Sequence, residues 1–148
     1  MGATVGRQAF RRGTVGLRSG NGRPLQGGAL ARRVQDEVFP YELNYFREAG
    51  RLGDSLHRLD GLWSAASHAA ASDEQELLRA REAAAMLATA RWMYRSALAR
   101  QESRGMHRRD DYPEPDDRYL HLVTSGGLDD VWTSARPLVS AQYSEAAE

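Results

Sequence analysis

Apolar residues recur at helical spacing in the first half of the chain. Val34 and Val38 precede Pro40, and beyond the proline one apolar face repeats every three or four positions (Tyr41, Tyr45, Ala49, Leu52, Leu56, Leu59 and Trp63). Proline lacks an amide hydrogen and clashes with the preceding helical turn. The pattern therefore predicts a helix that ends near Pro40 and a second helix over residues 41–63.

A longer helical pattern follows a stretch of small residues at 64–71. Ser72 and Gln75 have the spacing of a capping box, so we expect the helix to begin there. One face of a helix then carries mostly apolar residues at helical spacing (Leu77, Ala80, Ala84, Leu87, Arg91, Tyr94 and Leu98). Gly105 is a natural C-terminal stop. A helix of about thirty residues is typical of a bundle.

Two short runs rich in aromatic and β-branched residues, 119–123 and 131–135, lie on either side of Gly126 and Gly127. This arrangement predicts a β-hairpin, which needs a neighbouring surface to be stable. The predicted fold class is therefore mainly α, a three-helix-bundle-like (spectrin-repeat-like) domain with a small C-terminal β-hairpin.

Three regions are expected along the chain. Residues 1–28 contain eight glycines and no apolar periodicity, which predicts a disordered leader rich in Gly and Arg. The glycine spacing does not fit a phosphate-binding loop, and Phe10 is the one aromatic residue there, so stacking on nucleic acid is unsupported. Residues 29–139 form the predicted domain, and 140–148 a polar tail.

Composition narrows the function classes. The chain has 20 basic residues, all arginine, and 20 acidic residues, with no cysteine, so disulfides, iron–sulfur ligation and thiolate zinc sites are excluded within it. No apolar run reaches the roughly 20 residues that span a bilayer, and none resembles a secretory signal. We expect a cytoplasmic protein that does not itself enter a membrane and does not bind nucleic acid.

Charged residues are densest between the long helix and the hairpin. The segment reads E-S-R-G-x-H-x-R-x-D-Y-P over residues 102–113, and the candidate structural or interface residues are Glu102, Arg104, Gly105, His107, Arg109, Asp110, Tyr112 and Pro113. Arginine forks and carboxylates at this density are typical of a helix end tied to a neighbouring surface. We predict that Glu102, Arg104, Arg109 and Asp110 form ion pairs that fix the helix end and the loop, either within the domain or across an interface.

Catalysis and metal binding are poorly supported at this segment. His107 is flanked by Arg104, Arg108 and Arg109, whose charges oppose a bound metal cation. His107 and Asp110 have no nucleophile at a recognisable spacing, so an acid–base role is not favoured.

The same segment resembles the signature in the C-terminal helical domain of the fumarate reductase/succinate dehydrogenase flavoprotein family, which includes L-aspartate oxidase. The stretches 37–47, 90–105, 111–117 and 119–139 are also similar to that domain, in the right order, although Pro115 stands where arginine is common. The resemblance covers residues 30–139.

The resemblance implies that FAD and the catalytic groups lie in domains that precede this one. No position here matches those groups, so we expect no catalytic, cofactor-binding or metal-binding residue in this chain. It implies as partners an FAD-binding domain or subunit and, in complex-forming members, an iron–sulfur subunit, through which the enzyme lies peripheral to the membrane.

Three hypotheses remain open from the sequence. The chain is a detached C-terminal domain of such an oxidoreductase, or a separately encoded subunit that complements an FAD-domain protein, or an unrelated helical adaptor. A large exposed apolar face would favour the first two.

Overall fold

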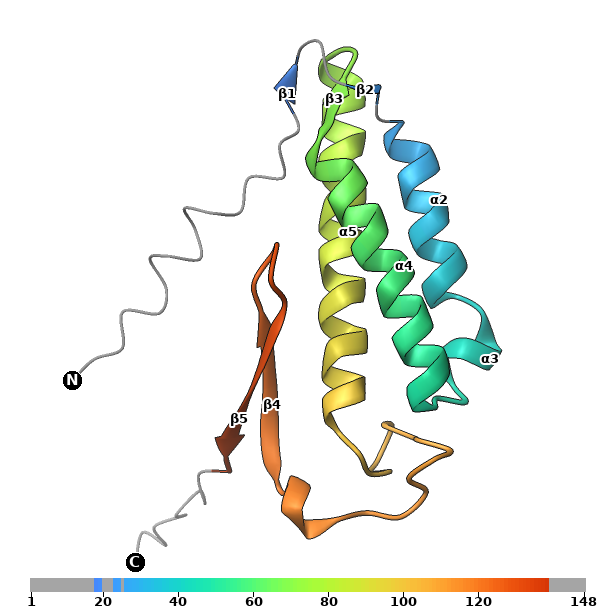
Figure 1. The fold of residues 1–148 in the computed structure, drawn as a ribbon, viewed down its shortest axis with the longest axis vertical. Helices are drawn as coiled ribbons and strands as arrows, with labels where there is room; N and C mark the ends of the chain where they lie inside the picture. The colour runs from blue at the N-terminus through green and yellow to red at the C-terminus, as the bar shows by residue number, and fades with distance from the viewer. Residues whose placement is uncertain (1–17, 20–22, 25, 139–148) are drawn as a thin grey trace, which may run out of the picture.

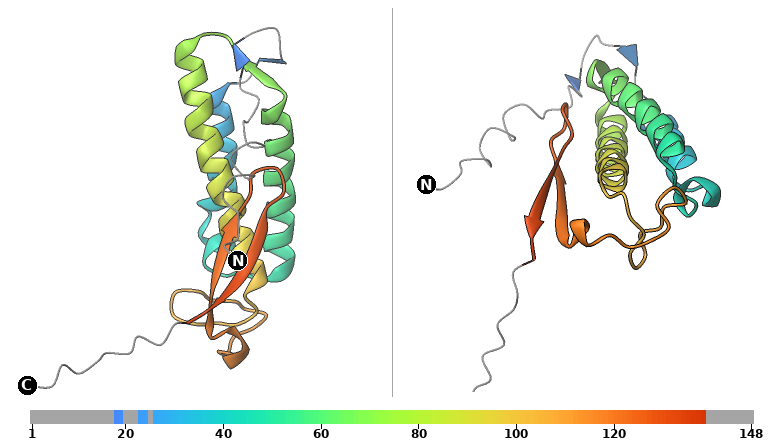
Figure 2. Two further views of the ribbon diagram at one scale, coloured as in Figure 1. Left: turned by 90° about the vertical axis from the view of Figure 1, so that its left-hand side faces the viewer. Right: turned by 60° about the horizontal axis from the view of Figure 1, so that its bottom comes forward.

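The computed structural model describes residues 18–19, 23–24 and 26–138. Three long helices, α2, α4 and α5, lie side by side, and the short helix α3 connects the first two. A hairpin covers one side of the longest helix, and a long loop crosses beneath the helix ends (Figures 1 and 2). The helices are α2 (Gly27–Val38), α3 (Tyr41–Asn44), α4 (Ala49–Ser67) and α5 (Glu74–Ala99). The hairpin consists of β4 (His121–Gly126) and β5 (Trp132–Pro137), which pair antiparallel. The predicted mainly helical fold with a C-terminal hairpin is confirmed.

The core lies between α2, α4 and α5. Its buried side chains come from the apolar faces predicted from the sequence, including Val34 on α2, Leu52 and Leu59 on α4, and Leu87 and Tyr94 on α5. Burial of each large aliphatic side chain contributes roughly 1.5–3 kcal/mol. The bundle is therefore stabilised chiefly by burial of the apolar faces that the sequence periodicity predicts.

The single helix expected over 41–63 is wrong. The helix α3 ends at Asn44 and α4 begins at Ala49, because the intervening backbone pairs with the loop after α5. The amide of Asp110 donates to the carbonyl of Arg47 at 2.7 Å, and the Arg47 side chain donates to the carbonyl of Asn44 at 2.8 Å. These contacts replace the intrahelical bonds that a continuous helix would make.

Both predicted ends of the long helix also differ. Asp73, one residue after Ser72, is the N-cap and accepts from the amide of Glu76 at 2.8 Å. The helix ends at Ala99, well before Gly105. Gly105, at φ +58°, lies instead in the tight turn between Arg104 and His107. An arginine from the following loop binds the last carbonyls of α5, so no glycine cap is needed there.

The hairpin is shifted by a few residues from its predicted position. A short 3-10 helix, Asp117–Tyr119, precedes β4, so the first strand begins at His121. Leu122 lies opposite Arg136 and Gly126 opposite Trp132, which leaves residues 127–131 as the turn.

Part of the predicted leader is structured. Two short strands, β1 (Arg18–Ser19) and β2 (Arg23–Pro24), pair parallel with β3 (Ala69–Ala71), and α2 already begins at Gly27. The rest of 1–25 and residues 139–148 lie outside the described residues. Among the helices of the described part, none combines the length and the apolar character that a membrane crossing needs.

Candidate functional site

Glu102 is the buried anion of the segment after α5. Its side chain is fully buried, and its carboxylate accepts from Arg100, from Nε of Arg104 at 3.0 Å and from the amide of Asp116 at 2.9 Å. Burial by itself would raise the pKa of Glu102, but these hydrogen bonds outweigh it, and the pKa lies below its usual value. The carboxylate is therefore charged at neutral pH and organises the loop around itself.

Arg109 is the buried cation of the same segment. Its side chain is 1% exposed, and it binds both oxygens of Asp111 in a bidentate pair, each contact 2.7 Å long. The remaining nitrogen donates to the carbonyls of Ala97 at 2.9 Å and Arg100 at 3.3 Å, which are orphan acceptors at the end of α5.

Asp111 extends this pair to a second helix. Its Oδ2 accepts from the amide of Ala49, the first residue of α4, at 2.9 Å, and the helix has no side-chain cap of its own from Glu48. The hydrogen bonds from Arg109 are the largest cause of the lowered pKa of Asp111. One arginine–carboxylate pair thus satisfies the C-terminus of α5 and the N-terminus of α4 at once.

The ion pairs predicted at Glu102, Arg104 and Arg109 form within the domain, but the within-domain pair expected of Asp110 does not form among the described residues. Arg109 binds Asp111. Asp110 is exposed, and its backbone amide donates to the carbonyl of Arg47. Because two acids are adjacent, charge alone does not tell which carboxylate faces the arginine. The spacing signal was nevertheless present, because the D of R-x-D-Y-P falls at residue 111.

His107 is held between two helix ends. Its Nε2 lies 3.1 Å from the carbonyl of Arg100, and its Nδ1 lies 3.3 Å from Nη1 of Arg47. A neutral ring with its proton on Nε2 satisfies both contacts. Burial lowers the pKa of His107, and the nearby guanidiniums of Arg47, Arg109 and Arg100 lower it further, against the hydrogen bond to the Arg100 carbonyl.

Tyr112 and Pro113 complete the loop at its surface. The guanidinium carbon of Arg109 lies 5.1 Å from the centre of the Tyr112 ring, in cation–π geometry. Ser103 donates to the carbonyl of Tyr112 at 2.8 Å, while Pro113 is exposed. The aromatic ring therefore packs against the buried Arg109, while its outer side stays exposed to solvent.

Two further arginines that hold the hairpin were missed from the sequence. Arg100 donates to the carbonyls of Tyr119 at 2.9 Å and His121 at 2.6 Å, where the first strand begins. The periodicity placed Arg91 on the apolar face of α5, and it is 3% exposed. An arginine in an apolar face is the signal that could have found it.

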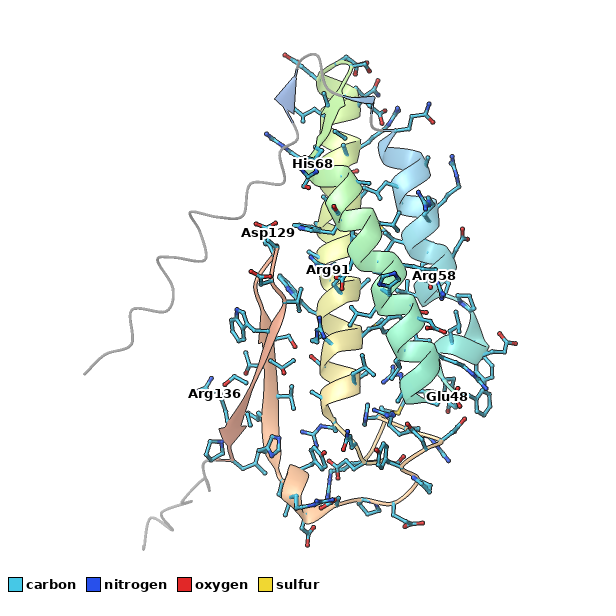
Figure 3. All side chains as sticks on the ribbon, viewed as in Figure 1. Glu48, Arg58, His68, Arg91, Asp129 and Arg136 are labelled. Carbon is cyan, nitrogen blue, oxygen red and sulfur yellow. The ribbon has the colours of Figure 1, made fainter. Side chains whose placement is uncertain are left out.

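Arg91 docks the hairpin turn on the bundle. It binds Asp60 of α4 at 2.6 Å, the carbonyl of Leu128, and the carbonyl of Asp129 at 3.2 Å. Figure 3 labels Arg91 on the bundle and Asp129 at the tip of the hairpin. Its guanidinium also lies 4.9 Å from the centre of the Trp63 ring. The hairpin is thus tied to α5 at its turn and at its base.

The described residues do not fit the diphosphate of FAD. A diphosphate is usually held by free amides at a helix N-terminus. Here the carboxylates of Asp73 and Asp111 bind amides at the starts of α5 and α4, and Glu76 accepts from the amide of Gly27 at the start of α2. These helix ends are already bound by anionic side chains of the chain itself.

The comparisons with known proteins agree with this architecture. A family model described as fumarate reductase flavoprotein C-term matches residues 34–143. A search of the curated proteins found no match.

Solved structures show the same fold. The Mycobacterium smegmatis Sdh1 complex in the apo form is 21% identical over 93% of this chain and 25% of its own, with a TM-score of 0.67. An adenosine-5-phosphosulfate reductase in complex with sulfite is 30% identical over 77% of this chain and 19% of its own, with a TM-score of 0.63. The FrdA subunit of E. coli quinol fumarate reductase, as a variant, is 20% identical over 93% and 26%, with a TM-score of 0.62.

The chain spans about a quarter or less of the length of each of these neighbours. The family match covers most of the chain and includes all of residues 102–113, the charged segment that we call the arginine–carboxylate loop. The chain therefore belongs to the fumarate reductase/succinate dehydrogenase flavoprotein family, as its C-terminal domain.

Proposed function

We propose that this chain braces and docks against the flavin-bearing part of an FAD-dependent oxidoreductase and performs no bond-making step itself. The observation that carries the proposal is the inward orientation of its charged groups. Glu102 and Arg109 are buried and fully engaged with other groups of the domain, and His107 is half-buried between Arg47 and Arg100. Groups committed in this way are not available to a substrate.

The arginine–carboxylate loop suits a mechanical role. It joins the end of α5, the start of α4 and the base of the hairpin through hydrogen bonds from Arg109, to Asp111 and from Arg100, and the Arg109 side chain is buried. Charge-assisted bonds in such surroundings are strong and directional. A rigid body of this kind can hold a large neighbouring domain in one orientation without contributing chemistry.

The substrate of the whole enzyme stays open within a class. The resemblance favours a dicarboxylate or similar acid, oxidised or reduced with FAD. The 30% identity to an adenosine-5-phosphosulfate reductase argues that domains of this kind occur in reductases of more than one specificity. We infer a cytoplasmic enzyme whose partners include a flavin-bearing body and an iron–sulfur subunit, and which reaches a membrane through those partners.

Flavin content and reconstitution test the proposal. The purified chain is expected to be colourless and inactive alone. Mixed with an FAD-domain protein from the same organism, it should form a complex with electron transfer that depends on an added dicarboxylate. A yellow isolated chain, or turnover of succinate or fumarate by the chain alone, would show the proposal to be wrong.

The reconstitution also addresses the second hypothesis. If the chain is a separately encoded subunit, the complex should form from two separately expressed polypeptides and gain activity. If it is a domain detached from its own flavin body, the two separate polypeptides should still bind one another, and activity should appear once they are joined genetically. Membership of the family weighs against the third hypothesis, an unrelated helical adaptor.

A further inference from the structure

Exposed aromatic side chains gather on one side of the bundle, where α2 passes into α3. Phe39 is 70% exposed, Tyr41 58% and Tyr45 47%, and across from them in the loop after α5 Met106 is 88% exposed. These residues and the guanidiniums of Arg47 and Arg108 line one surface hollow, which we call the aromatic–arginine hollow. Apolar surface of this kind is unusual on a side of a protein that contacts only water.

The aromatic wall of the hollow is preorganised. The rings of Tyr41 and Tyr45 stack with centres 4.9 Å apart, and Phe46 meets both edge-on at 5.4 and 5.8 Å. The backbone beneath them is fixed because Arg47 binds Asn44 through two nitrogens. Little ordering entropy is left to lose when a partner binds.

The charge of the hollow has one sign. Arg47 and Arg108 are its charged lining residues, and no carboxylate lines it. Arg47 hydrogen-bonds to Asn44 and His107. Arg108 is exposed, and within residues 26–138 no acidic side chain lies within salt-bridge distance of it. Tyr, Phe, Met and Arg are the residues enriched at the centres of protein interfaces.

We propose that the aromatic–arginine hollow receives a segment of the flavin-bearing body that carries an aliphatic side chain for the aromatic wall and a carboxylate for Arg108. This inference rests on the proposed function and names the surface through which the domain docks. We infer the carboxylate because the positive charge of Arg108 has no acidic partner among the described residues. We infer the aliphatic group because the rings and the exposed Met106 form an apolar surface.

The outer face of the hairpin is the rival surface. Leu122 and Trp132 are exposed there, but the same face also carries the polar side chains of Thr124, Ser134 and Arg136. A sheet face with this share of polar side chains is typical of one that faces solvent. Figures 1 and 2 show the hairpin and α3 on opposite sides of the long helix α5, so the two surfaces can be tested separately.

The experiment measures the affinity of the chain for the flavin-bearing protein of the reconstitution, by fluorescence anisotropy of the labelled chain. Arg108→Glu and Met106→Ser alter the hollow, and Arg136→Glu and Leu122→Ser are the matched changes on the hairpin. All four side chains are exposed, and an unchanged thermal unfolding curve establishes that each variant folds. Each hollow variant should raise Kd by about tenfold or more, and the hairpin variants by less than about threefold.

Salt separates the two contributions. The affinity of the unsubstituted chain should fall as salt is raised, and Arg108→Glu should remove most of that dependence. If the unsubstituted chain binds but the hollow variants bind equally well, or if the hairpin variants are the ones that lose affinity, the docking surface is wrong and the proposed function stands. If the unsubstituted chain binds no flavin-bearing protein, both fall.

Discussion

At the scale of single residues, the largest unfavourable term in the stability of this domain is the burial of charged side chains. Glu102, Arg109 and Arg91 are each at most 3% exposed, and each meets several partners of opposite charge or lone-pair oxygens. An ion removed from water without such partners would be destabilising by several kcal/mol. The arrangement is therefore sensitive to the loss of any one partner.

Glu102→Ala should lower the free energy of unfolding by about 2–4 kcal/mol, because Arg100, Arg104 and the amide of Asp116 lose their shared acceptor. Arg104 is 38% exposed and can turn to water, which limits the loss to this range. Urea unfolding measures the change. Glu114→Ala, an exposed acid of the same loop, is the control and should change stability by less than about 0.5 kcal/mol.

The His107 ring should make stability depend on pH between neutral and mildly acidic conditions. Its pKa in the folded state is lowered from about 6.5 by burial and by neighbouring arginines, so the unfolded chain binds the proton more readily. The contribution is fully present above pH 6.5 and is lost as pH falls below it towards the folded pKa.

Unfolding by urea at pH 7.5 and pH 5.5 measures this effect. His107→Gln removes the titrating group, so the variant should lose less stability between the two values than the unsubstituted chain. An equal loss in both proteins would mean that His107 takes up its proton in the folded state as easily as in water.

At the scale of elements, the contact between α2 and α5 depends on Gly27, which has no side chain. A Cβ on Gly27 would lie 2.5 Å from the amide nitrogen of Ala80 and 2.6 Å from the carbonyl carbon of Arg79. Those atoms belong to the backbone of α5 and cannot turn aside. The glycine therefore sets how closely the two helices approach, a role that the apolar periodicity does not reveal.

Gly27→Ala should destabilise the domain by about 1–3 kcal/mol, because α2 must move away from α5. Gly28→Ala is a matched control one residue along the same helix. A Cβ there would meet only the end of the Arg32 side chain at 3.9 Å, so helix propensity should make this change neutral or stabilising by up to about 1 kcal/mol. Thermal unfolding compares the pair, and similar effects of the two changes would contradict the close approach.

At the scale of the whole molecule, the Arg109–Asp111 pair couples parts that are far apart in sequence. It joins α4, α5 and the loop that leads to the hairpin, and the helices without it would still share an apolar core. Loss of the pair should therefore loosen the loop and hairpin before the three helices separate.

Arg109→Lys keeps the charge but cannot bind Asp111 and two carbonyls in the same planar geometry. We expect a loss of about 2–4 kcal/mol and faster amide exchange over residues 100–137 than over α2, α4 and α5. Hydrogen exchange followed by mass spectrometry measures both regions. Arg118→Lys, which alters an exposed pair with Asp116, is the control, and uniform loosening in Arg109→Lys would contradict a local role.

The sequence by itself determined the helices, the hairpin and the family, because apolar periodicity and a contiguous motif are local properties that need no knowledge of neighbours. Only the tertiary structure decided where α3 and α5 end, that Asp111 rather than Asp110 binds Arg109, and that Arg91 holds the hairpin. Each of these depends on a partner far away in the chain, whose hydrogen bonds outweigh the small differences in local preference between adjacent residues.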